Sequence, residues 1–531
     1  MTKYQNRQNE IVTRIAAEAI ELPRLASGLW FHNDIRNNYY YASYLLAAAT
    51  DEQMPIAFDR GRAVALGTEV LLRVLRLQNR DAEHQLFGHW PLGLNPSPEE
   101  AKPNPLPAEI LGCLIAYFYD QYADQLGAEL RGELEVTLET LYQAAYYRVP
   151  QAHYNHHESK YIATKLIFGS RYDDADLLQD GLDSLKQTLS RIQEKGMPEY
   201  GALPWFWHWV QAFTCAYACV QDAGIRGLLS DLLDKLWMVR AEHYLGGAWV
   251  GARMRSLAHD LPRDQNVLFD YVQFGDFAMP SMLPRVEYAG LLFYEAPAEA
   301  RRIALERTEP TELSQVVVPW QPDAAPLHKY TYITKHYAIG GMLERVQEFD
   351  NEQHRWDIAF PLIAEDTINH LYMFQPGAGY RAGDPRHQHN NGVVQVGKHV
   401  VAARYASSAE GEQRLVGVLP KGEWVEGEKA LFGYTFGVYV AIFLQGEYVL
   451  TEQEDRYELV SEGLPNGVIV EVREAAELSE HQVTDLPAFC RLMSKLTPVW
   501  SEREGKPSVV YRDLSGETYQ LVSADSQVLP D

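Results

Sequence analysis

The chain has 531 residues, too many for a single hydrophobic core, and 46% of them are hydrophobic, as in an ordinary globular protein. Its 72 acidic and 47 basic residues give a formal net charge of −25, which argues against nucleic acid and membranes as partners because the long-range field repels both. The sequence shows neither a secretory signal peptide nor a run of about 18 apolar residues, so we expect a cytoplasmic protein of two or three domains.

Up to about residue 310, apolar residues recur at the spacing of amphipathic helices, separated by joints rich in Pro, Gly or Asp. This pattern indicates paired helices in a closed or incomplete α/α toroid, whose concave face would receive helix starts and loops. Asp173 is the predicted N-cap of the helix that follows it. The predicted helices cover residues 66–78, 108–126, 134–147, 158–168, 174–193, 204–222 and 227–244.

Beyond residue 319 the pattern changes, because β-branched and aromatic residues partly alternate between turns that contain Gly, Asn or Pro. We therefore predict a multidomain α+β protein in which residues 1–310 form the toroid and residues 311–531 form an antiparallel β-sandwich of one or more layers. The predicted strands lie within residues 328–341, 391–405, 436–450, 457–474 and 506–523.

Polar, titratable residues precede one of the predicted apolar helices. Asn155, His156 and His157 stand directly before it. On a helical projection, Asn155 points within about 20° of Ile162, which belongs to the buried stripe. Asn155 therefore either caps the helix, with the histidines on the surface or in the core, or lies at the edge of a cleft that binds an acidic substrate.

A second candidate region combines a loop with aromatic residues. Glu199 and Tyr200 lie between Gly and Pro residues, and His208 stands among tryptophans that include Trp207. Indole rings stack on the apolar faces of sugars, while polar groups bind their hydroxyls. The alternative is that these aromatic residues, at helical spacing, pack in the core.

Two further pairs of residues could bind substrate. Arg253 and Arg255 lie in a glycine-rich loop and could hold a carboxylate in bidentate fashion, or pair with the protein's own acids. His387 and His389 would share one face of a strand or turn. A zinc site there would need further ligands that show no recognisable spacing, so we predict no required cofactor, although a structural metal ion is compatible with these residues.

The stretch NHHESKYIATKLIFGSRYDDADLLQDGL, within a chain that passes from helices to strands, resembles polysaccharide lyases of the heparinase II/III and alginate lyase type. The resemblance implies an α/α toroid followed by antiparallel sheets. In that family, an Asn–His stretch that opens a toroid helix neutralises the uronate carboxylate of the substrate. The resemblance gives this role to Asn155 and His156.

The family's catalytic tyrosine lies in a Gly…Glu…Pro…Tyr segment, but in GMPEYGALPWFWHW a Trp or Phe stands where the tyrosine would fall. The resemblance therefore leaves the catalytic base or acid to Tyr200, His208 or Tyr244. The family's β-domain histidine would correspond to one of three residues, His336, His387 or His389.

Together these residues predict β-elimination on a glycan that contains uronic acid. Amide, imidazole and guanidinium donors would offset the carboxylate charge and stabilise the developing enolate, and a tyrosine or histidine would transfer the proton. The predicted partner is an acidic oligo- or polysaccharide, imported and attacked in an exo fashion. A homo-oligomer is compatible with the sequence.

Two alternatives stay open at this point. A glycoside hydrolase on a similar toroid needs two carboxylic acids about 5–10 Å apart, for which Glu158, Glu199, Asp173 and Asp174 are available. The other alternative is a non-catalytic carbohydrate-binding protein. A lyase differs from both because its product gains a double bond that absorbs ultraviolet light.

Overall fold

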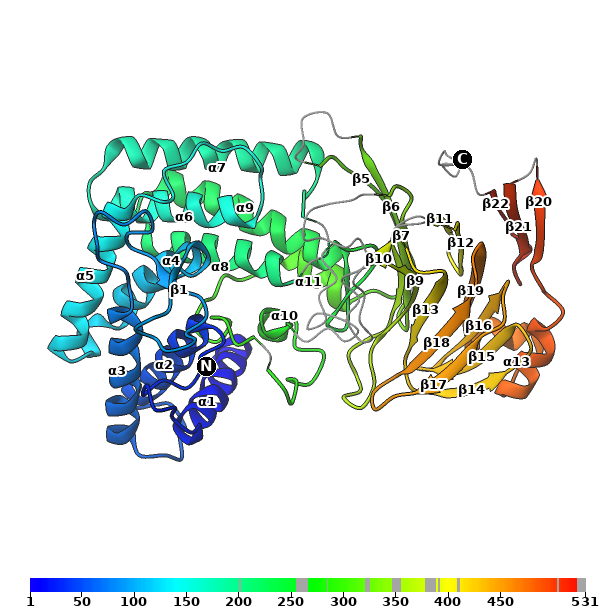
Figure 1. Ribbon diagram of the computed structural model, residues 1–531, viewed down its shortest axis with the longest axis horizontal. Coiled ribbons are helices and arrows are strands. Elements are labelled where there is room, and N and C mark those ends of the chain that lie inside the picture. The colour runs from blue at the N-terminus through cyan, green and yellow to red at the C-terminus, as the bar shows by residue number, and fades with distance from the viewer. Residues whose placement is uncertain are drawn as a thin grey trace.

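The protein has a helical N-terminal part and a C-terminal part of antiparallel sheets, which confirms the predicted order of secondary structure (Figure 1). The last helix of the first part, α11 (Ala298–Leu305), ends shortly before the first strand of the sheets, β5 (Thr311–Val317). The structure is a computed structural model that describes residues 1–199, 201, 203–254, 266–283, 285–319, 325–345, 355–377, 388–389, 392–407, 411–503 and 506–522.

The long helices alternate between inner and outer positions along the chain. As inner–outer pairs they are α2 (Ile35–Thr50) with α3 (Arg60–Arg76), α4 (Pro105–Tyr122) with α5 (Ala128–Ala144), α6 (His156–Arg171) with α7 (Ala175–Lys195), and α8 (Leu203–Cys219) with α9 (Ala223–Glu242). The inner helices also contact one another, and they are buried on nearly all sides, as their largely apolar surfaces require. The outer helix α7 is amphipathic, with one buried stripe.

Shorter elements complete the helical part. Helix α1 packs against α2 and the short α10, and α11 packs against α9. Their bounds are α1 (Lys3–Glu21), η1 (Ala123–Gln125), α10 (Leu268–Gln273), and two strand pairs, β1 (Trp90–Pro91) with β2 (Pro103–Asn104) and β3 (Tyr244–Leu245) with β4 (Ala248–Trp249).

Side-chain caps fix where the inner helices begin. Asp34, Asn104 and Asn155 accept hydrogen bonds from backbone N–H groups in the first turns of α2, α4 and α6. The predicted cap of α7, Asp173, is wrong by one residue. The chain passes through the left-handed region at Asp173, with φ of 54°, so the helix begins later and Asp174 caps it.

Three antiparallel sheets make up the C-terminal part. The first contains, in spatial order, β17 (Val449–Glu452), β18 (Tyr457–Glu462), β13 (Arg414–Leu419), β9 (His370–Pro376), β8 (Trp356–Ala359), β7 (Ala338–Met342), β6 (Leu327–Ile333) and β5, with β10 (Gln388–His389) paired to β9. The second contains β11 (Gly392–Val396), β12 (Val400–Tyr405), β19 (Asn466–Glu474), β16 (Val438–Leu444), β15 (Ala430–Thr435) and β14 (Glu423–Glu426). The third contains β20 (Val499–Arg503), β21 (Lys506–Arg512) and β22 (Thr518–Val522), preceded by α12 (Ala475–Leu478), η3 (Ser479–His481) and α13 (Leu486–Met493).

The second sheet is buried on both faces. In β16, Val438, Val440 and Ile442 share one hydrophobic core with residues of the first sheet. Tyr439 and Phe443 point the other way and pack with α13 and the third sheet. A strand covered on both sides has no polar face, which explains the nearly continuous apolar run at this place in the sequence.

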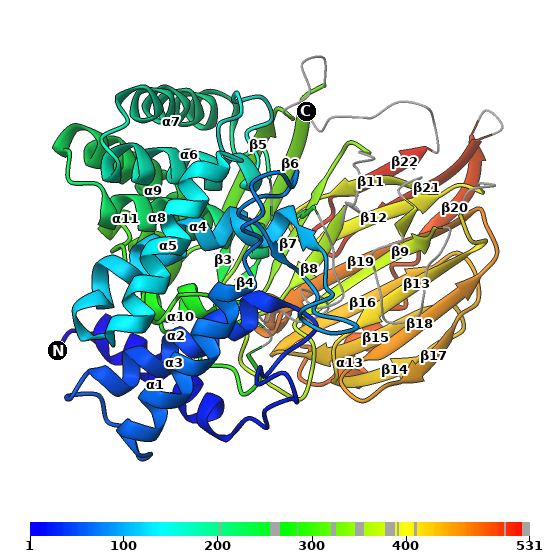
Figure 2. The same cartoon turned by 60° about the vertical axis from the view of Figure 1, so that its left-hand side comes forward.

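The helical part packs against the first sheet through the segment that follows α9. Leu245, Ala248 and Val250 form a small apolar cluster with residues of β6, β7 and β8. A Cβ atom at Gly340 of β7 would lie 2.7 Å from Cα of Gly251, so this close approach requires glycine. Figure 2 shows the two parts side by side at this sheet.

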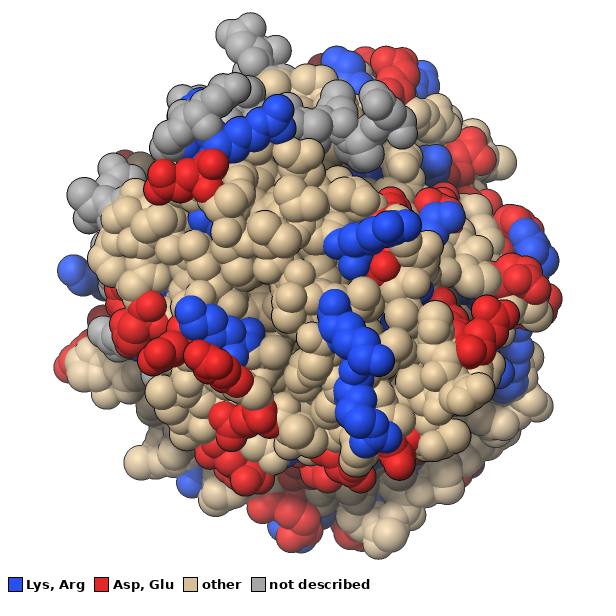
Figure 3. All heavy atoms as spheres, turned by 90° about the vertical axis from the view of Figure 1, so that its right-hand side faces the viewer, with Lys and Arg blue, Asp and Glu red and all other residues tan. Residues whose placement is uncertain are grey.

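No helix among the described residues is long and apolar enough to cross a lipid bilayer. Figure 3 views the end of the sheet part that lies farthest from the helices. Acidic and basic side chains are interspersed there around a broad uncharged area, so the negative net charge is not concentrated on this face.

Candidate functional site

The N-terminal ends of α4, α6 and α8 meet at one place. His156, the first residue of α6, stacks on Trp205 at the start of α8, with ring centroids 4.5 Å apart. His157 Nδ1 and Lys160 Nζ of α6 lie 2.7 and 2.6 Å from the carboxylate of Glu109 in α4. The buried charges are therefore paired. Since helix N-termini carry partial positive charge, this end of the helical part favours anions.

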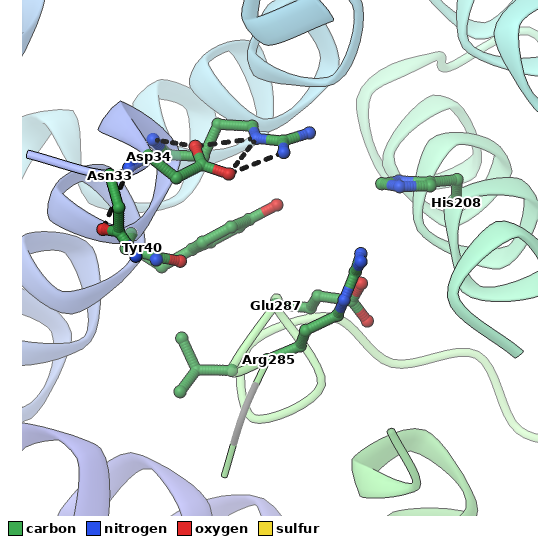
Figure 4. Close-up of a pocket in the computed structure, with 9 residues that line it drawn as sticks. Asn33, Asp34, Tyr40, His208, Arg285 and Glu287 are labelled. Atoms are coloured by element: carbon green, nitrogen blue, oxygen red, sulfur yellow. Dashed lines mark hydrogen bonds and ion pairs between the residues drawn. The ribbon is translucent and has the colours of Figure 1, made fainter. Parts of the chain in front are cut away.

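A cavity of about 230 Å³ lies beside this cluster. Its wall combines the start of α2, His208 of α8 and the loop that follows α10, and the ring of His208 lies 5.8 Å from that of His156. Figure 4 shows Tyr40, His208 and Arg285 extending toward the same space. The lining residues are Asn33, Asp34, Arg36, Asn37, Tyr40, His208, Arg285, Val286 and Glu287.

His208 presents a neutral imidazole to the cavity. The residue is 7% exposed, and its Nδ1 atom makes no hydrogen bond with any described residue. Burial, and then nearby cationic groups of which Lys160 is the strongest, hold the pKa of His208 well below its usual 6.5. The lowered pKa makes this imidazole a weak base, and an anion bound near the cationic groups would raise the pKa and strengthen it as a proton acceptor.

Tyr40 faces His208 across the cavity (Figure 4). Burial, and then the charge of Glu287, raises the pKa of the Tyr40 hydroxyl well above its usual value, so the phenol keeps its proton at neutral pH. Six residues earlier, Asp34 caps α2 and also binds Arg36, whose Nη2 atom donates to Asp34 Oδ2 at 2.6 Å. The helix cap thereby fixes a guanidinium in the cavity wall.

The loop with Arg285 has an unusual backbone at Glu287. This residue has a φ of 35°, in the left-handed region that residues other than glycine rarely adopt, and it is 4% exposed. Conformations of this kind cluster at functional sites, where the surrounding structure holds them. The loop brings one guanidinium and one carboxylate to the cavity.

Behind the cavity, the buried carboxylate of Glu199 is hydrogen-bonded to His156. Its Oε1 atom shares a hydrogen bond with His156 Nδ1 at 2.6 Å, and Oε2 accepts from Trp209 Nε1 at 2.7 Å. Burial raises the pKa of Glu199 from 4.5 to about 7, although the bond from Trp209 opposes the shift. Glu199 therefore exchanges its proton near neutral pH, next to the ring that stacks beside His208.

Asn155 and Glu158 are occupied by the backbone. Asn155 Oδ1 accepts from the N–H groups of His157 and Glu158, so it is the N-cap of α6. Its amide Nδ2 forms no hydrogen bond with the described residues and stays available to a ligand. The Glu158 carboxylate accepts from three successive N–H groups, those of residues 152–154, which makes it an anchor of that loop rather than a free acid.

Three predicted substrate or catalytic residues lie in buried contacts away from the cavity. Trp207 is fully buried and donates from Nε1 to the carbonyl of Asn266. Tyr244 is also fully buried, and its hydroxyl donates to Asp276. Arg253 pairs with the buried Asp357 of β8 at 2.7 Å and joins the helical part to the first sheet. Trp207 therefore packs in the core and Arg253 pairs with an acid of the protein, which are the alternatives that the sequence left open for them. Tyr244 is a core residue as well.

Most of the remaining predicted residues, or their side chains, lie outside the described part of the chain. Tyr200, Arg255 and His387 lie outside the described residues. His389 belongs to β10, which pairs with β9, and its side chain lies outside the described part of the chain. His336 is exposed in the turn between β6 and β7. Of the predicted set, His208 lines the cavity, and Asn155, His156 and His157 lie at the adjoining helix start.

The cavity also contains residues that the sequence analysis did not single out. Asp34, Arg36 and Tyr40 belong to FHNDIRNNYYY, where polar and charged residues precede a long apolar helix. Polar residues also precede an apolar helix at Asn155, so this pattern marks both the start of α2 and the start of α6. Arg285 and Glu287 lie in an irregular loop with no periodic signal.

Comparisons with known proteins add no assignment. A scan of the chain against models of known protein families finds no match, and a search of curated proteins finds none that is significantly similar. Within the residues that the structure describes, no group of three or more His, Cys, Asp or Glu side chains has the arrangement of a metal site. The functional argument therefore depends on the cavity and its chemistry.

Proposed function

We propose that the protein is a lyase that cleaves a glycan containing uronic acid by β-elimination. The observation that carries this proposal is the presence, in one cavity, of a neutral imidazole, a protonated phenol and two guanidinium groups, from His208, Tyr40, Arg36 and Arg285. A cation that binds the carboxylate, a proton acceptor and a proton donor are what β-elimination requires. The carboxylates of Asp34, paired with Arg36, and of Glu287 line the same cavity. The volume of about 230 Å³ suits roughly one sugar ring, being below the ~300–1,000 Å³ of larger ligand pockets.

In the proposed mechanism, Arg285 binds the uronate carboxylate and offsets its charge, and Arg36, which pairs with Asp34, adds a second donor at the wall. His208 then takes the C5 proton, which its neutral imidazole can accept. The electron pair left on C5 forms the C4–C5 double bond while the bond from C4 to the leaving oxygen breaks. Tyr40 donates its proton to that oxygen. The guanidinium groups stabilise the enolate-like charge that develops before the bond breaks.

The cluster behind the cavity has a supporting role in this proposal. His156 stacks beside His208, and the free amide of Asn155 lies one residue before it. Glu199 holds the His156 ring and, with its pKa of about 7, can share its proton with that ring. We propose that Asn155 Nδ2 adds a neutral donor at the edge of the substrate site.

We also propose the finer architecture. The alternation of inner and outer helices supports an incomplete α/α toroid in residues 1–310, with the cavity at the end where inner helices begin. The core shared by the first and second sheets supports a β-sandwich in residues 311–531, extended by a third layer of α13 and β20–β22.

A glycoside hydrolase is the second candidate, and the raised pKa of Glu199 favours it. A carboxylic acid that stays protonated near neutral pH is what a hydrolase uses as general acid. Glu287 in the cavity would have to serve as the second carboxylate. Glu158, the other acid considered from the sequence, is held by three backbone N–H groups.

The two candidates are separated by incubating the protein with uronic-acid polysaccharides and their oligosaccharides. A lyase gives new ultraviolet absorbance, and a hydrolase gives new reducing ends without it. We expect absorbance to rise for the native protein and to be abolished in His208→Asn and Arg285→Gln. The matched control is Tyr434→Phe, a change at an exposed side chain of β15 in the second sheet, which should retain full activity. Binding without either product would assign the protein to the non-catalytic class and overturn the proposal.

A further inference from the structure

Arg404 of β12 is buried and has no hydrogen-bond or ion-pair partner among the described residues. The residue is 2% exposed, and its Nε, Nη1 and Nη2 atoms make no hydrogen bond with any described residue. Buried guanidinium groups are normally paired and hydrogen-bonded, because an isolated buried charge is strongly unfavourable. Burial lowers the pKa of Arg404, and no carboxylate of the described residues forms an ion pair with it. The described residues therefore leave its positive charge uncompensated.

The position of Arg404 in the sheet shows what surrounds it. Val401 and Ala403 point to the core shared with the first sheet, so Arg404 points to the opposite side, which the third sheet covers. There the Trp500 ring of β20 lies 5.4 Å from the guanidinium carbon. Trp500 is only partly buried and belongs to the edge strand of the third sheet.

Gly467 makes room for this ring. It is the residue opposite Arg404 on the neighbouring strand β19, and a Cβ atom there would lie 2.5 Å from the Trp500 ring. The indole therefore lies directly over the backbone beside the guanidinium. Any larger residue at this position would displace the ring and uncover Arg404.

Two carboxamides on the same face also have unmet hydrogen bonds. Gln395 on β11 is opposite Ala402, two residues from Arg404 along β12. Gln445 extends β16 and donates its backbone N–H to Gly467 on the other side. The Oε1 atoms of both are buried, and neither accepts a hydrogen bond from the described residues. One guanidinium and two carboxamides thus lie on one face of the second sheet, with β19 between Arg404 and Gln445, and the indole of the third sheet lies over this face.

We propose that this face is a non-catalytic binding site for a sugar acid. The Arg404 guanidinium would bind the carboxylate in bidentate fashion, the carboxamides of Gln395 and Gln445 would bind hydroxyls, and the Trp500 ring would move aside to cover the apolar face of the sugar. The site lies at the opposite end of the molecule from the cavity near α2 and α8 (Figure 1). It does not depend on the lyase proposal.

The test is the binding of glucuronate, glucose and acetate, by calorimetry and by thermal unfolding, in an Arg285→Gln background that weakens the cavity. We expect glucuronate to bind and to raise the unfolding temperature, acetate to bind more weakly, and glucose to do neither. Arg404→Met should lower glucuronate affinity at least ~10-fold and should be no less stable than its parent without ligand, because it removes an unpaired buried charge. Arg503→Met, an exposed change on the strand of Trp500, is the matched control and should bind normally.

A second variant keeps the test independent of folding. Trp500→Ala should weaken glucuronate binding and leave acetate binding unchanged, because it removes the sugar contact and keeps the guanidinium. The proposal is overturned if glucuronate does not bind, if Arg404→Met binds it normally, or if Arg404→Met is clearly destabilised without ligand. The last result would mean that the chain itself neutralises Arg404. Absence of lyase activity would not affect any of these outcomes.

Discussion

Arginines of the helical part occupy two contrasting surroundings. Near the first sheet, Arg240 is fully buried, donates to both carboxylate oxygens of Asp270, and also bonds the carbonyls of His243, Gly247 and Ala248. After α10, Arg285 instead lines an open cavity beside a neutral histidine and a protonated tyrosine. Arg36 at the start of α2 also lines the cavity, but it pairs with Asp34. The contrast teaches that burial alone does not make a charged residue functional. An internally satisfied arginine stabilises the fold, and an arginine at a cavity can bind a ligand.

After the loss of activity expected for His208→Asn and Arg285→Gln, the largest effect on turnover should follow from removing the proposed proton donor of the cavity. Tyr40→Phe deletes one hydroxyl oxygen and leaves the ring in place, so turnover should fall by ~10²–10⁴-fold with little change in unfolding temperature. Initial rates followed by ultraviolet absorbance measure the first quantity, and calorimetry measures the second. Tyr434→Phe serves as the control. Equal rates for Tyr40→Phe and the native protein would remove the phenol from the mechanism.

Breaking the buried Arg240–Asp270 pair should lower the free energy of unfolding rather than turnover. Arg240→Met leaves the buried Asp270 charge without compensation, and we expect a loss of about 3–5 kcal/mol in the free energy of unfolding. Urea unfolding measures this loss, and Arg131→Met on the exposed side of α5 should change little. A loss as small as that of the control would show that the two surroundings do not differ as described.

Glu199 should make stability depend on pH. Its pKa is 4.5 before burial and about 7 in the folded protein, so the protonated form stabilises the fold. Relative to Glu199→Gln, the native protein should therefore lose stability as pH rises from about 4.5 to about 7, by on the order of 3 kcal/mol at most. Parallel thermal unfolding curves across this range test the prediction. A constant difference between the two proteins at all pH values would contradict it.

The smallest effect concerns the two roles of Asn155. Asn155→Ala removes the cap of α6 and should cost about 1 kcal/mol of stability. Asn155→Asp retains the cap but replaces the amide donor by a negative charge that repels a uronate. It should therefore fold normally and show a higher KM. If Asn155→Asp has the native KM, the residue is a cap alone.

The sequence allowed the change from helices to antiparallel sheets to be predicted, because apolar spacing differs between the two. It also led to His156 and His208, since titratable residues are unusual at the start of apolar helices. Trp207 was harder, because a residue on the apolar stripe of a helix can face either a core or a cleft, and Tyr244 was harder because it lies beyond the end of α9, in the short strand β3. Arg285 could not be predicted as a site residue, because an irregular loop carries no periodic signal. The pairing of Arg253 with Asp357 joins distant segments, which spacing cannot reveal.

The central claim is that the cavity breaks a glycosidic bond by elimination and not by addition of water. The most direct test is the mass of the products formed in water enriched in oxygen-18. Elimination predicts that the fragments together have the mass of the substrate and contain no heavy oxygen. Fragments that together exceed the substrate by one water, with heavy oxygen at the new reducing end, would contradict the account.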